Sequence, residues 1–503
     1  MDSTVAERTG DWKKGVIKAH ENARYLKDGR HFIDEPEIAR VLKDRRDAAP
    51  SLIREIIRKS LEIKTLEPAE AAALLGVRDN DLWEEIFQAA AQIKRKVYDN
   101  RVVTFAPLYC SSHCVNNCAY CGFRGENQAI ERRRLSIAEV RKEAEVLAGK
   151  LGHKRLVVVF GEHPSSDAAY ICDVMREVYA VKVKTRRGFG AIRRVNVNAA
   201  PMNVADYKKV KAAGIGTFQV FQETYHPATY SRVHPPSTIK GDYLWRLYSL
   251  HRAMEAGIDD VAIGALFGLY DWRFEVMGLL AHARDLERCF GIGPHTVSFP
   301  RLEPAANTPF VRATGHAVSD ADFKKLVAVL RLSIPYAGMI VTCRENPATM
   351  REVIAMCTQR DASSKVGIGA YSERGDVQEE NIQQFILGDS RSLDAVIRDL
   401  AAMGYITSFC TAGYRCGRTG DNIMDMLKSG KEGCLCKLNA VLTFQEWLED
   451  FASDETKAIG EKLIAREIAE IEKRVPGDFT PQALEAFKEY HGRIKRGERD
   501  LCF

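Results

Sequence analysis

Residues 102–121, VVTFAPLYCSSHCVNNCAYC, join an apolar run to a close group of cysteines. The run over residues 102–108 is apolar and β-branched, which is typical of a buried strand. Cys114, Cys118 and Cys121 follow directly, separated by three and then two residues. Because the active sites of closed (β/α) barrels form at the carboxyl ends of their strands, this order predicts such a barrel, with the cysteines at its mouth.

Similar β-rich runs alternate with amphipathic helical patterns farther along the chain, and the clearest helix begins with the capping box Ser136–Glu139. Strands separated by helices pair in parallel through right-handed crossovers, so these units predict a (β/α)8 TIM-type barrel. A doubly wound open sheet is the alternative, but no Gly-rich dinucleotide fingerprint follows the first strand. The predicted strands are residues 102–108, 156–160, 192–198, 217–222, 261–267, 296–301, 339–343 and 366–370.

The barrel accounts for only part of the 503 residues. Apolar residues recur at helical spacing from Leu82 to Val97, which predicts a helical N-terminal extension over residues 1–98. We expect the barrel over residues 99–375 and a helical C-terminal domain, with a second group of cysteines, over residues 376–503.

Composition excludes several classes of partner. The net charge of +5 is spread along the chain, and basic stretches such as 94–96 and 132–134 are typical of solvated faces rather than of a nucleic-acid track. No apolar run approaches the roughly 20 residues that span a bilayer, and the first residues lack the apolar core of a signal peptide. We therefore expect a cytoplasmic enzyme with neither nucleic-acid nor membrane partners.

The chain has 13 cysteines, unevenly distributed. In a reducing compartment such groups favour metal or redox chemistry over disulfides. The two groups are Cys110, Cys114, Cys118 and Cys121, then Cys410, Cys416, Cys434 and Cys436. For most of the five remaining cysteines, the default interpretation is that each is a small, buried hydrophobic residue. The scattered cysteines are Cys172, Cys289, Cys343, Cys357 and Cys502.

The spacing of the first group points to a specific metal centre. Three thiolates at Cys114, Cys118 and Cys121 can hold three irons of a 4Fe–4S cluster and leave the fourth iron open. The open iron can chelate a methionine-type ligand, and electron transfer into its sulfonium would break a carbon–sulfur bond. A structural zinc site, with Cys110 or His113 as fourth ligand, is the alternative. Zinc normally takes four closed ligands in paired short spacings, so the spacing favours iron and sulfide.

These residues resemble the radical S-adenosylmethionine (radical SAM) superfamily, whose signature is Cys-x3-Cys-x2-Cys with an aromatic residue before the last cysteine. Tyr120 fills that place, and the resemblance implies that it lies near the adenine of S-adenosylmethionine (SAM). A Gly-Gly-Glu-like element after strand two binds the methionine amino group in the family. Gly161 and Glu162 occupy that position, with Glu162 as the implied ligand. Glu223, at the end of the fourth predicted strand, is expected to line the same cavity.

Further stretches resemble the radical SAM aromatic amino-acid lyases, among them the thiazole-biosynthesis tyrosine lyase (2-iminoacetate synthase) and, most closely, the FeFe-hydrogenase maturation tyrosine lyase. The stretches are APLY (106–109), CVNNC (114–118), GEHP (161–164), FQETYH (221–226), LFGLYD (266–271) and GPHT (293–296). The resemblance implies that a 5′-deoxyadenosyl radical takes a hydrogen atom from L-tyrosine. The Cα–Cβ bond then breaks to give p-cresol and dehydroglycine. Implied partners are an electron donor such as ferredoxin or flavodoxin, and other hydrogenase maturation proteins.

The stretch TCRE (342–345) ends the seventh predicted strand and resembles the family's substrate-carboxylate element. We expect Arg344 to bind the carboxylate, because its forked guanidinium matches that group, with Thr342 assisting. The alternative is that Arg344 pairs with Glu345 or with another acidic residue at the barrel rim. Three histidines near the motifs are either proton carriers or structural residues, and the structural role is the default for each. These are His163, His226 and His295.

The hydrogenase maturation lyases carry a second iron–sulfur cluster on Cys-x2-Cys-x22-Cys, which helps convert dehydroglycine into carbon monoxide and cyanide. Cys410 and Cys436 keep the outer spacing, but Gly413 stands where the middle cysteine belongs. Glycine has no side chain to bind iron, so the family site cannot form unaltered. Either Cys416 or Cys434 replaces the missing thiolate, or the site is lost and the reaction stops at dehydroglycine.

A barrel histidine also holds the additional iron of that family, and the resemblance implies His282 in this place, although a histidine on an amphipathic helix is more often structural. Three functions stay open. The first is a tyrosine lyase of the maturation type. The second is a radical SAM lyase that acts on another aromatic amino acid such as tryptophan, or that supplies dehydroglycine to another pathway such as thiazole synthesis. The third is a metal-binding scaffold without catalysis.

Overall fold

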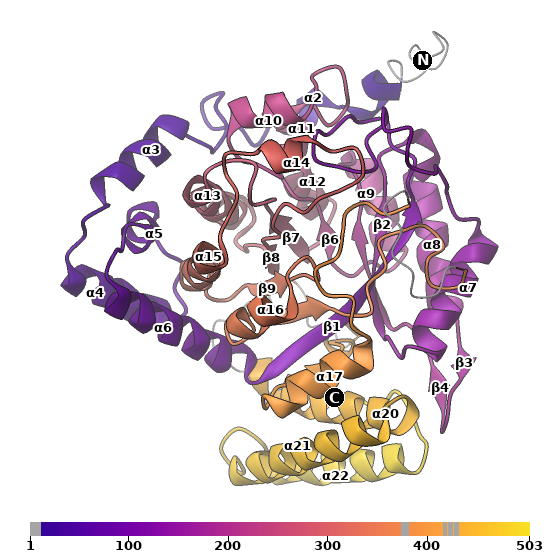
Figure 1. The fold of residues 1–503 in the computed structure, drawn as a ribbon. Helices are drawn as coiled ribbons and strands as arrows, with labels where there is room; N and C mark the ends of the chain where they lie inside the picture. Colours follow the sequence, from indigo (N-terminus) through magenta and orange to yellow (C-terminus); the bar gives the residue numbers. More distant parts are fainter. Residues whose placement is uncertain (1–11, 374–381, 416–419, 421–425, 427–431) are drawn as a thin grey trace.

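A closed barrel of eight parallel strands forms the centre of the computed structural model, which describes residues 12–373, 382–415, 420, 426 and 432–503 (Figure 1). Pairing between the last and first strands closes the sheet. The (β/α)8 prediction is therefore confirmed. The strands are β1 (Arg101–Ser111), β2 (Arg155–Phe160), β5 (Arg194–Asn198), β6 (Phe218–Gln219), β7 (Val261–Gly264), β8 (Thr296–Ser298), β9 (Gly338–Val341) and β10 (Gln359–Asp361).

The eighth predicted strand is wrong. Residues 366–370 form no strand, since Gly367 makes one isolated bridge with Gln383 and residues 368–370 form a turn. The strand that closes the barrel is β10, which pairs with residues 103–105 of β1. The side chains of β10 are polar, and residues distant in the sequence form hydrogen bonds and ion pairs with them. Arg360 forms a buried ion pair with Asp389 at 3.0 Å, and Asp361 accepts a hydrogen bond from the backbone of Cys343 at 2.7 Å. Because these partners lie elsewhere in the chain, no apolar run marks the strand.

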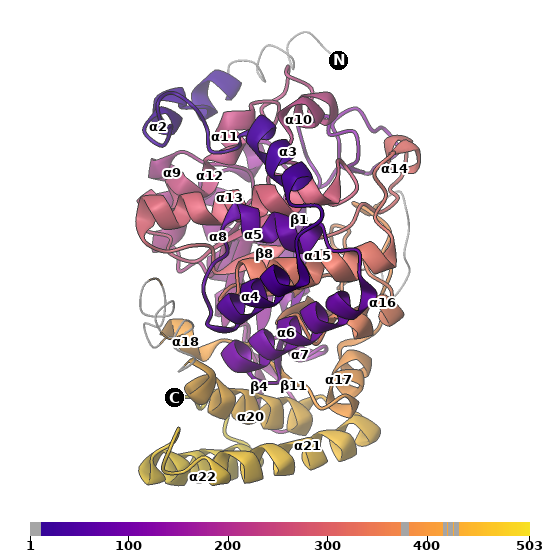
Figure 2. The same ribbon diagram turned by 90° about the vertical axis from the view of Figure 1, so that its left-hand side faces the viewer.

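A ninth strand, β11 (Ile406–Ser408), extends the sheet at residues 101–103 of β1, outside the closed barrel. It lies in the region that we expected to be entirely helical, and three buried residues are too short to give a periodic signal. The helices of this region gather at one end of the barrel (Figures 1 and 2). They are α17 (Leu393–Ala402), α18 (Ala412–Arg415), α20 (Glu432–Asp450), α21 (Asp454–Lys473) and α22 (Pro481–Lys495).

Helices between the strands cover the outside of the barrel. The Ser136 hydroxyl accepts a hydrogen bond from the Glu139 backbone at 3.3 Å, which confirms the predicted capping box. The remaining short strands, β3 (Val183–Lys184) and β4 (Phe189–Gly190), form an antiparallel pair. The helices are α7 (Ile137–Gly149), α8 (Ala168–Ala180), α9 (Val204–Ala212), α10 (Pro227–Val233), α11 (Tyr243–Leu247), α12 (Ser249–Glu255), α13 (Trp272–Phe290), α14 (Phe310–Ala313), α15 (Asp320–Ser333) and α16 (Pro347–Val353), together with the 3-10 turn η1 (Pro164–Ser166).

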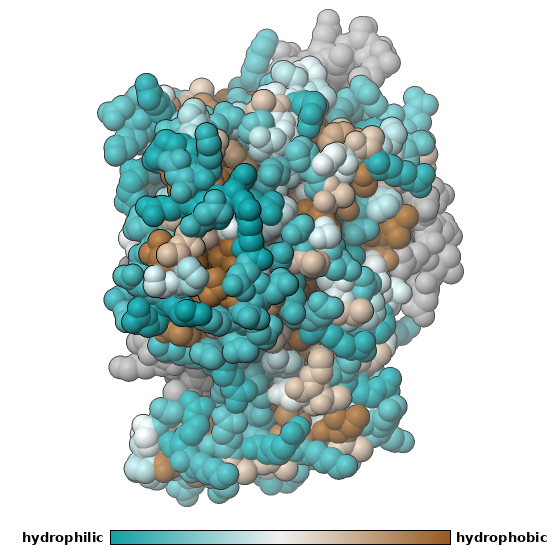
Figure 3. Space-filling view, turned by 60° about the vertical axis from the view of Figure 1, so that its left-hand side comes forward, coloured by the Kyte–Doolittle hydropathy of each residue, from teal (hydrophilic) through white to brown (hydrophobic). Residues whose placement is uncertain are grey.

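Helices precede the barrel, as the apolar spacing predicts. They are α2 (Ala19–Ala23), α3 (Glu35–Asp44), α4 (Pro50–Leu61), α5 (Pro68–Leu75) and α6 (Asn80–Tyr98). The predicted apolar face of α6 is buried against α4 and α15. Hydrophilic residues dominate the face of the molecule shown in Figure 3, with smaller apolar areas between them. None of the described helices combines the length and apolar character needed to cross a membrane.

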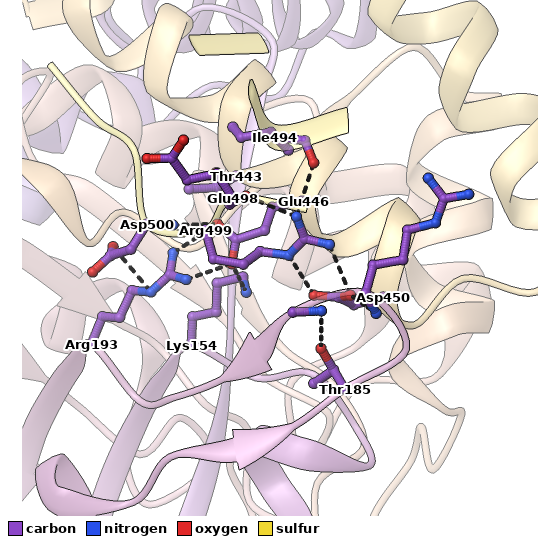
Figure 4. A network of polar contacts seen from close by, with 12 residues as sticks. Lys154, Thr185, Arg193, Thr443, Glu446, Asp450, Ile494, Glu498, Arg499 and Asp500 are labelled. Carbon is purple, nitrogen blue, oxygen red and sulfur yellow. Dashed lines mark hydrogen bonds and ion pairs between the residues drawn. The ribbon is translucent and has the colours of Figure 1, made fainter. Parts of the chain in front are cut away.

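Buried charges join α20 to the amino-terminal ends of the strands (Figure 4). Glu446 binds Lys154, just before β2, at 2.7 Å, and it also pairs with Arg193, just before β5. Burial raises the pKa of the Glu446 carboxyl, but these two cations outweigh it, so the pKa lies well below its ordinary value. The C-terminal helices are therefore docked by an ion-pair network as well as by apolar packing.

Candidate active site

A cavity lies at the carboxyl ends of the barrel strands, and seven of the eight strands, together with the residues just after β7, contribute to its wall. The cysteine loop between β1 and α7 closes one side of it. The strand residues that line the cavity include Tyr109, Phe160, Asn198, Gln219, Ser298, Ile340 and Asp361, with Leu266 just after β7. All nine residues expected around the barrel metal, cofactor and substrate also line it, namely Cys114, Cys118, Tyr120, Cys121, Gly161, Glu162, Glu223, Thr342 and Arg344.

Asn116 holds the cysteine loop in place, a role that its sequence position did not reveal. Its amide donates to a carboxylate oxygen of Glu162 at 2.6 Å, and its carbonyl oxygen accepts from the backbone of Lys240 at 2.9 Å. The backbone of Val115 also donates to the Glu162 carbonyl at 2.9 Å. The loop that carries the three thiols is thus fastened to the segments after β2 and after β6.

The spread of the three loop sulfur atoms bears on which metal group they fit. With Zn–S bonds of about 2.3 Å, three thiolates on one tetrahedral zinc lie about 3.8 Å apart. Across the described ranges, the one set of three or more potential ligands with donor atoms within 4.8 Å of one another is His251, Asp285 and Cys289. The three loop sulfurs therefore do not all lie within 4.8 Å of one another in this structure, and this spread fits thiolates that bind separate irons of a cluster.

The loop thiols are buried, and this affects how they take up metal. Burial raises the pKa of Cys118 to about 11, and it also raises the pKa values of Cys114 and Cys121. The metal-free thiols are therefore protonated at neutral pH. Each must release its proton to bind iron, since the thiolate is the ligand form.

Gly161 and Glu162 lie beside the cysteine loop. A methyl group on Gly161 would lie 2.3 Å from the carbonyl oxygen of His113, so only glycine fits this close approach. One carboxylate oxygen of Glu162 binds Asn116, while the other, Oε1, is buried without a hydrogen-bond partner. Burial raises the pKa of Glu162, and the charges of Arg246 and Lys240 oppose the shift. The unpartnered oxygen suits a cationic amino group, which supports the fit to SAM.

Glu223 occupies a left-handed backbone conformation, with φ of 70°. Its carboxylate pairs with Lys240 at 2.7 Å and with Arg246 at 3.1 Å. Burial raises its pKa, but these cations outweigh burial, and the pKa lies below its ordinary value. Glu223 is therefore ionised in the cavity wall. Sequence reasoning missed both cations, because they lie 17 and 23 residues beyond Glu223 and carry no motif.

Tyr120 is fixed from two sides. Its hydroxyl lies 2.8 Å from His234 Nε2, and Lys240 lies 5.6 Å from the centre of its ring. Burial holds the pKa of His234 well below its ordinary value, so the imidazole is neutral. Since His234 Nδ1 lies 3.1 Å from the Tyr230 carbonyl, it donates there, and Nε2 accepts the Tyr120 proton. The aromatic residue before Cys121 therefore has one orientation in the cavity wall.

Arg344 and Thr342 follow the end of β9, which is two strands around the barrel from β1, and they line the same cavity as the cysteine loop. The expected alternative, an ion pair between Arg344 and Glu345, is wrong, because Glu345 pairs with Arg301. Among the described residues the Arg344 guanidinium forms no salt bridge, and it lies over the Phe385 ring at 3.4 Å. The hydroxyl oxygen of Thr342 is buried without a partner. Arg344 Nη1 donates to the Arg301 carbonyl at 3.3 Å, so in the described chain its other N–H groups and the Thr342 hydroxyl are available to a ligand in the cavity.

The candidate histidines lie outside the lining of the cavity. The imidazole of His163 contacts Ser165 at 2.7 Å, and that of His226 contacts Glu35 at 3.1 Å. His282, in the middle of α13, lies 2.8 Å from the Tyr225 hydroxyl and stacks near His251. Nothing in the described ranges connects His282 with the C-terminal cysteines, so its expected role in holding iron lacks geometric support.

The second group of cysteines lies at the opposite end of the barrel. Cys410 follows β11, and its carbonyl accepts a hydrogen bond from Arg155 at the start of β2, at 3.4 Å. Cys436 is buried on α20. Cys416 lies outside the described residues, as does the Cys434 side chain. The structure therefore separates the two groups of cysteines by the length of the barrel.

Comparison with known proteins agrees with the fold. The radical SAM superfamily model matches residues 108–277, and the model of the biotin and thiamin synthesis associated domain matches residues 298–406. The 2-iminoacetate synthase of Salmonella typhimurium is 30% identical over 354 residues, which are 69% of this chain and 88% of that protein.

Two solved structures cover nearly all of the chain. A crystal structure of HydG, a maturase of the [FeFe]-hydrogenase, is 46% identical with a TM-score of 0.87, covering 94% of this chain and 100% of that one. HydG from Carboxydothermus hydrogenoformans is 34% identical with a TM-score of 0.75, covering 90% and 97%.

Proposed function

Because this chain belongs to the radical SAM superfamily and has the fold of its carbon–carbon lyases, we propose that it cleaves the Cα–Cβ bond of L-tyrosine to p-cresol and dehydroglycine. The observation that carries the proposal is the shared cavity. An arginine without a salt bridge in the described chain, Arg344, faces the same space as the three loop cysteines. A carboxylate-binding group and a cluster-binding loop are what a radical lyase acting on an amino acid needs.

The family implies a 4Fe–4S cluster and SAM, and the cavity residues fit both groups. Cys114, Cys118 and Cys121 would hold the cluster, while Glu162, Tyr120 and Glu223 would contact SAM. When bound, these groups supply one-electron cleavage of the sulfonium and hydrogen-atom abstraction from the substrate. An electron-donor protein such as ferredoxin or flavodoxin would provide the electron that starts this cleavage.

The chain itself binds, orients and shields the substrate. Arg344 can receive the amino-acid carboxylate through two parallel hydrogen bonds, and the Thr342 hydroxyl can add a third. This anchors the Cα atom at the mouth of the barrel. Phe105, Phe123 and Phe385 line the cavity and exclude water, which protects reactive species from side reactions. The bond to Cβ breaks most readily when the departing fragment is benzylic, as it is in tyrosine.

A second candidate concerns the fate of the product, and Gly413 favours it. If no other residue replaces the regular cluster ligand, the chain would release dehydroglycine instead of converting it to carbon monoxide and cyanide. The curated relative from Salmonella typhimurium, a 2-iminoacetate synthase, is named for that same compound. Under this candidate the protein supplies another pathway rather than other hydrogenase maturation proteins. Assays for cyanide and carbon monoxide separate the two candidates.

The test is an anaerobic assay of the reconstituted full chain with SAM, a reductant and L-tyrosine. We expect equal amounts of 5′-deoxyadenosine and p-cresol. If p-cresol is absent while another aromatic amino acid supports turnover, the substrate assignment is wrong. If neither product forms in a chain with a full iron and sulfide content, the lyase function itself is wrong.

A further inference from the structure

The last residues of the chain are anchored along α20. Both oxygens of Asp450 accept hydrogen bonds from Arg499, at 2.7 and 2.9 Å, and both side chains are fully buried (Figure 4). The backbone of Asp500 donates to Glu446 at 3.2 Å. The backbone of Phe503 and the side chain of Asn439 exchange two hydrogen bonds, at 2.9 and 3.2 Å. Residues 499–503 are therefore held in one place.

This anchoring sets Cys502 beside α18, the segment in which Gly413 lies. Arg415 connects the two, since its Nη2 lies 3.7 Å from the Cys502 sulfur and its Nη1 lies 2.8 Å from Asp500. The Nε of the same guanidinium donates to the carbonyl of Thr411 at 3.1 Å. Thr411 lies between Cys410 and Gly413, so the Cys502 sulfur is one side chain away from the gap left by the glycine.

Cys436 lies on α20, the helix that holds the last residues of the chain. Asn439, which holds Phe503, lies three residues after Cys436, and residues three apart share a helix face. Cys410 approaches from the end of β11. Cys502 is thus next to both segments that carry the outer cysteines of the second group, although sequence order places it 66 residues beyond Cys436.

From this juxtaposition we infer that Cys410, Cys436 and Cys502 bind an iron–sulfur cluster, in which Cys502 supplies the thiolate that Gly413 cannot. Each thiol releases one proton as it binds iron. A cluster on three thiolates carries negative charge, which the guanidinium of Arg415 beside Cys502 stabilises. The site lies at the other end of the barrel from the cavity, and it does not depend on the proposed tyrosine chemistry.

The experiment uses a full-length background that lacks the barrel cluster, with Cys114→Ala, Cys118→Ala and Cys121→Ala combined. After anaerobic reconstitution with ferrous iron and sulfide, we expect residual iron, acid-labile sulfide and an electron paramagnetic resonance signal on reduction. Adding Cys502→Ala should remove all three readouts. The matched control, Cys172→Ala, removes a buried thiol elsewhere and should leave them unchanged.

A rescue variant separates a ligand from a merely structural residue. Adding Gly413→Cys to the chain that lacks Cys502 should restore the residual cluster, because it returns a thiolate to the regular spacing. The inference is overturned if the background binds no iron, if it binds metal without sulfide, or if Cys502→Ala keeps the cluster. Loss of the cluster on Cys502→Ala without rescue by Gly413→Cys would also overturn it. Since the background has no barrel cluster, each result is independent of tyrosine cleavage.

Discussion

Two buried glutamates show how differently the two ends of the barrel are built. Glu446, 1% exposed at the amino-terminal ends of the strands, is paired with Lys154 and Arg193. Glu275, 0% exposed on α13 near the cavity, is held by the hydroxyl of Thr224 and by the backbone of Tyr225 at 2.8 Å. The cations lower the pKa of Glu446, whereas burial among neutral donors raises the pKa of Glu275 to about 8.

The amino-terminal ends of the strands contribute mainly to stability, whereas the cavity end is built to bind ligands. At the amino-terminal ends, buried charges meet opposite charges, so this end docks the C-terminal helices. At the cavity end, Glu162 and Thr342 keep buried oxygens without partners, and burial raises the pKa of Glu162. Such groups cost stability until a ligand satisfies them. Changes at the cavity end should therefore affect activity, and changes at the other end should affect folding.

The largest expected effect is on activity. Cys118→Ala should abolish p-cresol and 5′-deoxyadenosine formation completely, because two thiolates cannot hold the cluster with one iron open. Product analysis and iron content measure this loss. In the control, Cys357→Ala removes a fully buried thiol that does not line the cavity. That variant should keep its iron and its turnover, and equal losses in both would contradict the assignment of the cavity as the active site.

Glu446→Ala is expected to lower the stability of the folded chain. It leaves Lys154 and Arg193 buried without their carboxylate, which costs about 3–5 kcal/mol of unfolding free energy. Urea unfolding of the full chain measures this change. Glu455→Ala is the control, because Glu455 is 69% exposed in its pair with Arg398 and should cost at most about 1 kcal/mol. If both variants lost similar amounts of unfolding free energy, the buried pair would contribute no more to stability than the exposed pair, which would contradict the prediction.

Arg344→Lys tests whether Arg344 binds the substrate carboxylate, and a smaller effect is expected. Lysine keeps the charge but loses the fork, so we expect KM for tyrosine to rise roughly 10- to 100-fold, equivalent to about 1.5–3 kcal/mol, with little change in unfolding. Steady-state kinetics measure it. Arg351→Lys alters an exposed arginine that pairs with Asp399, and it should leave KM unchanged. A decrease in kcat alone would argue against carboxylate binding by Arg344.

The smallest expected effect is the pH dependence contributed by Glu275. Its folded pKa is raised from 4.5 to about 8, so its stabilising contribution is complete below pH 4.5 and is lost as the pH rises through 8. Between pH 6 and pH 7, the unmodified chain should lose about 1.4 kcal/mol more unfolding free energy than Glu275→Gln. Urea titrations at both pH values measure the difference. Parallel curves for the two chains would show that this carboxyl is ionised when folded.

Local patterns predicted much of this molecule. The helical face of α6, the capping box at Ser136 and seven of the barrel strands follow from short-range spacing, and the structure has them. The eighth strand escaped prediction, because Gln359–Asp361 is polar and its partners come from elsewhere in the chain. In the cavity, Asn116, Lys240 and Arg246 escaped for the same reason. Each is identified by what it contacts and by no motif of its own.

The sequence by itself determined which residues approach the cavity, since the cysteine spacing and the strand ends are set by covalent connection over a few residues. Only the tertiary structure decided how the charges pair. In the folded chain Glu345 pairs with Arg301, so Arg344 does not form an ion pair with Glu345. Cys502 lies beside Arg415, which is 87 residues away in the chain. Covalent geometry constrains near neighbours, whereas pairing between distant residues depends on how the whole core is buried.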